Sequence, residues 1–247
     1  MLSAIGILAV GWKQIAASLF FYRNYLGDSD WFTGHYWSLS IEEQFYLLWP
    51  FVLVLAGTKR ARILAIAGIL EVVVWRQIHW PLPWVANHYT GMRLDAILCG
   101  SVMALSWSDL KPTLQKASAF VIPAATVGFL AADAWSYALQ GFTDFIQALL
   151  ICVLIGSTVA SSASWQSRIL EFSVLKWVGR LSYSIYLWQE LFLQPVPAPH
   201  WQLPLRVGIF FVLAWLSYRF IERPMIAMGQ RVVKSYEKKP TFESALA

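Results

Sequence analysis

Long apolar runs alternate with short polar or basic connections along nearly the whole chain. A bilayer core about 30 Å thick needs roughly 20 helical residues to cross it, so each run of this length is a candidate membrane-spanning helix. The pattern predicts an all-α fold, a polytopic transmembrane helix bundle of about eight spans. These spans are expected near residues 2–21, 40–58, 62–79, 90–107, 117–139, 143–162, 179–194 and 204–222.

Lysine and arginine occur in every second connection between these runs. The connections 80–89, 140–142 and 195–203 contain neither residue. Because basic residues favour the cytoplasmic side, we expect both termini in the cytoplasm and the stretch before Ser40 outside. The expected location is a plasma membrane, and for a bacterium the inner membrane. The basic connections contain Lys59, Arg60, Arg62, Lys111, Lys116, Arg168, Lys176 and Arg180.

Composition agrees with a membrane protein. Hydrophobic residues make up 58% of the 247 positions and charged residues 13%, against about 25% charged in soluble domains. The net charge of +5 comes from basic residues at the ends of apolar runs, so no nucleic-acid partner is expected. Cys99 and Cys152 fall inside apolar runs, and no Cys or His spacing is typical of a metal site. We therefore predict neither a metal nor a bound cofactor.

The stretch His35–Pro50, HYWSLSIEEQFYLLWP, places the adjacent carboxylates Glu42 and Glu43 beside aromatic and aliphatic residues. Ser40 and Glu43 have the spacing of a capping box, in which each side chain accepts a hydrogen bond from a free amide at a helix start. One interpretation is therefore that a helix begins at Ser40 and that Glu43 is a capping residue.

A second interpretation of the same stretch concerns His35, Ser38 and Glu42. Their i, i+3, i+7 spacing puts them on one helical face if the helix reaches back to His35. A histidine, a hydroxyl and a carboxylate in line could transfer protons, or could form a hydrogen-bonded seam against another helix. The residue pattern leaves both alternatives open.

Further polar side chains interrupt later apolar runs. Arg93 and Asp95 are two positions apart, so they point to different sides of a helix, and each needs a partner elsewhere. A charge at mid-bilayer costs about 2.5–3.5 kcal/mol, which favours a polar cavity between helices or a structural ion-pair network. Ser182, Tyr186 and Gln189 share one face of the seventh run and could bind a ligand or another helix.

Four segments together resemble the acyltransferase-3 family of integral membrane acyltransferases. They occur in the family's order and cover most of the chain. The segments are HYWSLSIEEQFYLLWP (35–50), MRLDAILCGSVMA (92–104), VGRLSYSIYLWQ (178–189) and SYRFIERPMI (217–226).

The resemblance implies that the chain is a membrane-bound O-acyltransferase that acts in polysaccharide modification. Such enzymes transfer an acyl group, typically acetyl, from cytoplasmic acyl-CoA to a hydroxyl of an extracytoplasmic glycan or glycolipid. The expected partners are an acyl-CoA donor, above all acetyl-CoA, a cell-surface glycan or glycolipid acceptor, and the lipid bilayer. Two alternatives stay open: a non-catalytic protein that binds or transports a glycan or lipid-linked intermediate, and an inactive truncated relic.

The matching segments supply the candidate site residues. We predict catalytic roles, near the outer face, for Glu42, Glu43 and His35. Side chains expected to bind substrate or line the cavity are Arg93, Asp95, Trp37, Ser38, Tyr186 and Gln189.

The chain departs from the family's pattern at its beginning. The family has about ten helices, and its first helix carries a basic residue separated by ten positions from a histidine. That spacing does not occur here, so we expect the family's first two helices to be missing from this sequence. The predicted organisation is a transmembrane acyltransferase-3-like domain over residues 1–225 and a basic cytoplasmic tail over residues 226–247.

Overall fold

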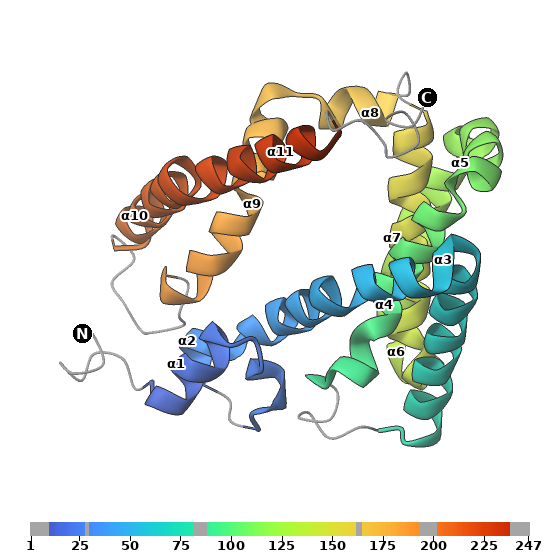
Figure 1. The fold of residues 1–247 in the computed structure, drawn as a ribbon, viewed down its shortest axis with the longest axis horizontal. Helices are drawn as coiled ribbons and strands as arrows, with labels where there is room; N and C mark the ends of the chain where they lie inside the picture. Colours follow the sequence, from blue (N-terminus) through green and yellow to red (C-terminus); the bar gives the residue numbers. More distant parts are fainter. Residues whose placement is uncertain (1–9, 28–29, 82–87, 162–164, 193–201, 238–247) are drawn as a thin grey trace, which may run out of the picture. The chain divides into compact units, whose positions relative to one another are not determined.

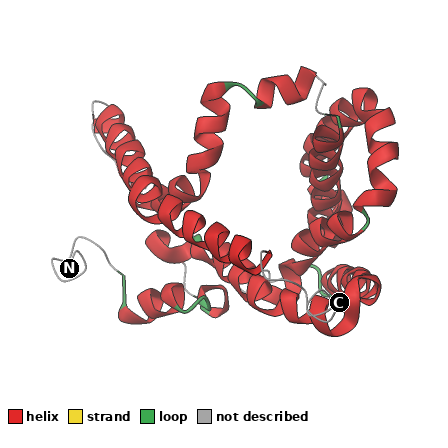
Figure 2. Ribbon diagram, turned by 45° about the horizontal axis from the view of Figure 1, so that its top comes forward, coloured by secondary structure: helices red, strands yellow, loops and turns green. Residues whose placement is uncertain are grey.

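The computed structural model describes residues 10–27, 30–81, 88–161, 165–192 and 202–237. Every regular element in these ranges is helical, which confirms the all-α prediction (Figure 2). The chain divides into two compact units, residues 1–172 and 173–247. The domain limits expected from the sequence, 1–225 and 226–247, stay a prediction.

The first unit is built around helix α3, which packs against α4, while α5 packs against α7 (Figure 1). Its apolar core consists of Phe45, Ala65, Ile69, Val73, Leu98 and Cys99. The elements are α1 (Trp12–Leu19), η2 (Arg23–Tyr25), α2 (Trp31–Gly34), α3 (Tyr36–Ile78), α4 (Thr90–Leu105), α5 (Trp107–Ala134), α6 (Ser136–Leu139), η4 (Gln140–Phe142), α7 (Thr143–Ala160) and α8 (Trp165–Leu170).

A single glycine breaks α3 into two helical halves. Gly57 has φ +73° and ψ 163°, a backbone conformation that is accessible essentially to glycine alone. Figure 1 shows that the halves before and after this residue run in different directions. The break falls where the second expected span gives way to the third, so the two runs read from the sequence correspond to the two halves of α3.

The start of α3 differs from the capping-box prediction, which is wrong. The helix begins at Tyr36, with His35 as its N-cap, so Ser40 lies in the second turn. The Ser40 hydroxyl donates to the carbonyl of Tyr36 (2.9 Å) and accepts the amide of Arg23 (3.2 Å). The Ser40 oxygen therefore accepts the amide of Arg23, 17 positions away, whereas a capping serine would accept an amide at the start of its own helix.

The predicted number of spans is not confirmed. Among the described residues, the helices Gln140–Ala160 and Gln202–Ser235 are long and apolar enough to cross a membrane. Trp107–Lys116 and Phe120–Ala132 meet at 98° and add a third if they count as one span. Helix α4 has only 16 residues, short of the roughly 20 that a full crossing requires. Residues 2–9 of the first expected span, 2–21, lie outside the described residues.

The second unit consists of α9 (Ser173–Phe192), α10 (Gln202–Ser217), the π-helical turn η5 (Tyr218–Glu222) and α11 (Arg223–Glu237). Helix α9 packs against α10. Buried Ser184 on α9 donates a hydrogen bond to Glu222 Oε2 (2.9 Å) and so links α9 to the π turn. The segment expected to be a tail is helical as far as Glu237.

We expect Gly57→Ala to destabilise the first unit. No atom lies within 4 Å of the position an added Cβ would take, so the cost, about 1–3 kcal/mol, comes from backbone strain alone. Gly100→Ala in the interior of α4 also adds a Cβ into open space and is the matched control. Thermal denaturation in detergent should show a lower Tm for Gly57→Ala only; equal midpoints would contradict the strain.

Candidate functional site

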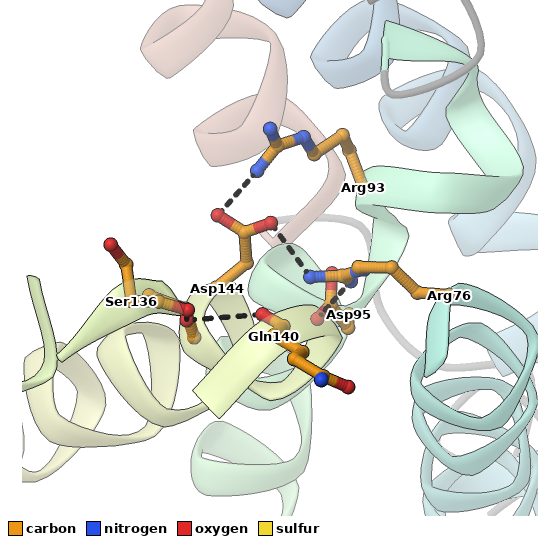
Figure 3. A network of polar contacts seen from close by, with 7 residues as sticks. Arg76, Arg93, Asp95, Ser136, Gln140 and Asp144 are labelled. Carbon is orange, nitrogen blue, oxygen red and sulfur yellow. Dashed lines mark hydrogen bonds and ion pairs between the residues drawn. The ribbon is translucent and has the colours of Figure 1, made fainter. Parts of the chain in front are cut away.

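Arg76, near the end of α3, joins three helices through two carboxylates (Figure 3). Its Nη2 lies 2.6 Å from Asp95 Oδ2 on α4, and its Nη1 lies 3.0 Å from Asp144 Oδ2 on α7. The Arg76 side chain is 0% exposed and that of Asp95 1%. Buried charges persist only when they are paired, so these contacts fix how α3, α4 and α7 meet.

Arg93 extends this chain of charges toward the surface. Its Nη1 lies 2.8 Å from Asp144 Oδ1, so each carboxylate oxygen of Asp144 receives a different arginine (Figure 3). The side chains of Arg93 and Asp144 are 23% and 33% exposed. The Arg93 guanidinium carbon also lies 5.8 Å from the ring centre of Trp37, within the range of a cation–π contact. Trp37 in turn meets the buried ring of His88 edge-on at 4.4 Å.

A close backbone approach places Asp144. A Cβ on Gly141 would lie 3.0 Å from the amide nitrogen of Gln77 and 3.1 Å from the carbonyl carbon of Arg76, so glycine lets η4 sit against the end of α3. Gln77 Nε2 donates to Gln140 Oε1 across the same contact (2.9 Å). Asp144 follows in the first turn of α7, where the helix dipole favours a negative charge.

The acidic pair of the predicted site lies on the first half of α3. Glu42 is exposed and Glu43 half-buried. His35 caps the same helix, and its ring lies 4.0 Å from that of Tyr36, with both ring nitrogens buried. The Ser38 hydroxyl donates weakly to the carbonyl of His35 (3.4 Å). The helix therefore reaches back to His35, as the one-face interpretation requires; the catalytic roles themselves stay predictions.

The sequence argument for Arg93 and Asp95 is confirmed. The two residues do not pair with each other, and each finds its partner on another helix. In the structure Trp37 makes a cation–π contact with Arg93, and Asp95 forms an ion pair with buried Arg76.

Tyr186 and Gln189 lie on α9 of the second unit, where both are half-buried. Their predicted roles in substrate binding stay predictions, as does that of Ser38. Among the described residues, no group of His, Cys, Asp and Glu could hold a metal ion.

A second, uncharged polar cluster ties the start of α3 to the start of α4. Thr90 Oγ1 accepts from Asn24 Nδ2 (2.9 Å) and from the Tyr25 hydroxyl (3.0 Å), and it donates to Gln44 Oε1 (2.5 Å). Gln44 Nε2 donates to Asn24 Oδ1 (3.1 Å). Tyr25, Gln44 and Thr90 form the polar part of an otherwise apolar pocket of about 520 Å³, which also contains Phe45, Trp49, Val52, Leu64, Leu94 and Leu98.

Sequence reasoning missed several residues of this region. Arg76 and Asp144 stand at the end and at the start of apolar runs, where a charge looks like an ordinary helix boundary. Arg23 is also buried, and its Nε donates to Thr33 Oγ1 (2.9 Å). The available signal was the two-residue spacing of Arg93 and Asp95, which points them to different sides of the helix and so predicts one acidic and one basic partner elsewhere.

Comparison with known proteins then identifies the class. The family of acyltransferase domains matches residues 2–221, nearly the whole chain. The chain belongs to the acyltransferase-3 family. No solved structure matches it.

Two curated relatives of the chain carry names that include peptidoglycan O-acetyltransferase. Peptidoglycan O-acetyltransferase OatA of Listeria monocytogenes is 32% identical over 217 residues, which cover 78% of this chain and 35% of that protein. YrhL of Bacillus subtilis, provisionally named a peptidoglycan O-acetyltransferase, is 31% identical over 79% of this chain and 35% of its own length. The chain thus spans about a third of the length of these relatives.

The buried ion pair gives a prediction about stability. Arg76→Gln should cost about 3–5 kcal/mol, because it leaves Asp95 as an uncompensated buried charge. Asp95→Asn should cost less, because Arg76 keeps its ion pair with Asp144. The double variant should cost less than the sum of the two single variants, since both members of the pair are gone. Reversible unfolding in mixed micelles measures this coupling.

The exposed pair Arg62 and Asp109, 3.5 Å apart with side chains 39% and 72% exposed, is the matched control. Arg62→Gln and Asp109→Asn should each change the free energy of unfolding by about 0–1 kcal/mol. Additive effects at Arg76 and Asp95 would show that this pair does not act as a unit.

The polar cluster gives a second stability prediction. Thr90→Val keeps the shape of the side chain but removes the oxygen shared by Asn24, Tyr25 and Gln44, so about 1–3 kcal/mol should be lost. Thr126→Val is the control, because Thr126 Oγ1 donates only to a carbonyl of its own helix, that of Ile122. The two free energies of unfolding in detergent should differ; equal losses would contradict a shared hub at Thr90.

Proposed function

We propose that the chain transfers an acyl group, typically acetyl, from acyl-CoA to a hydroxyl of an extracytoplasmic glycan. Membership of the acyltransferase-3 family supports acyl transfer, and the names of the relatives OatA and YrhL favour peptidoglycan as the glycan. The observation that carries the proposal is the alternating row Asp95, Arg76, Asp144 and Arg93, which begins in the protein interior and ends at a side chain that solvent reaches.

The expected orientation puts this row on the outer side of the membrane. Arg76 lies in the last turn of the half of α3 that begins beside the basic residues Lys59 and Arg60. Asp144 lies in the first turn of α7, after the uncharged connection 140–142. Basic connections favour the cytoplasm, so the opposite ends of these helices lie outside. An extracytoplasmic acceptor would meet the protein at this end.

The reaction needs a base and a group that stabilises negative charge. The acceptor hydroxyl loses its proton to the base, and its oxygen attacks the thioester carbonyl carbon. A C–O bond forms, the C–S bond breaks, and coenzyme A leaves as its thiol after taking up a proton. Glu42, with Glu43 and His35 beside it, is the proposed base, since carboxylates and imidazoles perform this role.

Arg93 is the proposed electrostatic partner of the reaction. Its guanidinium is held in place by Asp144 and by the face of Trp37, so little reorganisation is needed when charge develops on the carbonyl oxygen. Arg76 and Asp95 do not contact the substrate in this proposal. Arg76 positions the Asp144 carboxylate, and that carboxylate holds Arg93.

Glu42→Gln should lower acyl transfer by about 10²–10⁴-fold, the usual contribution of a general base, while the protein level stays unchanged. The measurement is incorporation of radiolabelled acetyl from acetyl-CoA into cell-wall glycan by membranes that contain the complete protein. Glu71→Gln is the matched control, because Glu71 is an exposed carboxylate on the other half of α3.

Full activity of Glu42→Gln would remove Glu42 from the reaction. The unsubstituted protein could also bind glycan without consuming any acetyl-CoA. That result would contradict acyl transfer and would favour a protein that binds or transports glycan.

A further inference from the structure

Helix α11 continues the last apolar helix of the chain well beyond the length of a membrane crossing. Residues Gln202–Ser235 form one helical stretch of 34 residues, drawn orange to red in Figure 1. At 1.5 Å per residue this stretch is about 51 Å long. A bilayer core is only about 30 Å thick, so the C-terminal part has to lie outside it.

The composition changes where this excess length begins. Helix α10 carries one charged residue, Arg206, whereas α11 carries Arg223, Arg231, Lys234 and Glu237 among apolar residues. Between them lies the π turn Tyr218–Glu222, which departs from regular α-helical geometry while Gln202–Ser235 still runs as one helix.

The side chains of α11 separate onto two faces. At 3.6 residues per turn, one face contains Met225, Ile226, Met228, Val232 and Val233, all of them exposed in the described structure. The opposite face contains Arg223, Gln230, Arg231 and Lys234, and the sequence continues with Lys238 and Lys239. A helix with one apolar and one basic face is typical of segments that lie in the plane of a membrane surface.

We propose that α11 is an interfacial helix that binds the anionic headgroup layer of the membrane in which α10 is embedded. Its apolar face enters the boundary between headgroups and acyl chains, and Arg223, Arg231 and Lys234 contact lipid phosphates. A water-exposed helix would gain nothing from the apolar face. A neutral surface would leave the basic face without complementary charge.

The position of the helix fits this occupant. Arg223 follows the apolar stretch without a linker, so α11 starts at the level where the span leaves the hydrocarbon. The basic residues also agree with the expected cytoplasmic side, whose leaflet holds anionic lipids that attract such segments. Lying on the surface requires the axis to bend at the π turn when a membrane is present, and π turns are among the sites at which helices bend.

The test uses the full chain in lipid vesicles. Cys99 and Cys152 are first replaced by alanine, and a bimane label is placed on Val232→Cys on the apolar face or on Gln230→Cys on the basic face. Lipids with a nitroxide on the acyl chain quench a label that enters the membrane, and iodide quenches one in water. Vesicles contain phosphatidylcholine alone or with phosphatidylglycerol, in both leaflets, so the result is independent of orientation.

In vesicles with phosphatidylglycerol we expect the lipid quencher to act several-fold more strongly at Val232 than at Gln230, and iodide to show the reverse order. Phosphatidylcholine alone, or high salt, should reduce the quenching at Val232. Iodide access to both labels in every vesicle would show that the helix projects into water, which overturns the proposal. Protection of Val232 from both quenchers would show that protein covers the face, with the same consequence.

A charge variant separates lipid binding from general electrostatics. Arg223→Gln, Arg231→Gln and Lys234→Gln together should abolish the dependence on phosphatidylglycerol. The matched control removes the same charge from exposed residues on α3 and α5, with Lys59→Gln, Arg60→Gln and Lys111→Gln, and should keep that dependence. Equal effects of the two triple variants would overturn the role of α11.

Discussion

The arrangement of the first unit depends on one guanidinium. Arg76 draws a carboxylate from α4 and another from α7 to the end of α3, and the second carboxylate holds Arg93. The four charges balance to zero, so a row of ions can exist among apolar helices without a net buried charge. Such a row adds little net stability compared with apolar packing, but loss of any one member is costly. Its main effect is therefore on geometry, because only one arrangement of the three helices satisfies all four groups.

The same geometry explains why the candidate site is built in two layers. The inner pair, Asp95 and Arg76, is closed to solvent, and its position is fixed by the ion pair between them. The outer pair, Asp144 and Arg93, is oriented by the contact of Asp144 with Arg76 and remains accessible to solvent. Trp37 contributes an aromatic ring from the early part of α3, the same segment that contains the histidine and the two carboxylates for which we propose catalytic roles. The long interrupted helix thus contributes to the region from both of its halves.

Much of this could be predicted from local patterns. The positions of the apolar runs predict where the helices lie, and the two-residue spacing of Arg93 and Asp95 predicts that their partners lie elsewhere. The identity of those partners could not be predicted, since Arg76 lies 19 residues from Asp95, and Asp144, the partner of Arg93, lies 68 residues from Arg76. The capping box failed for the same reason: Ser40 accepts the amide of Arg23, 17 residues away, and not a free amide at the start of its own helix. The face pattern of α11 was present in the sequence, but the many lysines and arginines made the segment look like a tail.

The pairing of Asp95 and Arg76 also bears on how the protein is made. The ribosome produces residues in order at about 5–20 per second, so Arg76 emerges before either of its acidic partners. In the expected topology a lone arginine would have to cross the bilayer without a partner, which is costly. Asp95 follows within seconds, and Asp144 only after two further helices have been synthesised. Insertion of α3 and α4 as a joined hairpin, with the pair already formed, avoids that barrier, and α7 completes the charge balance last.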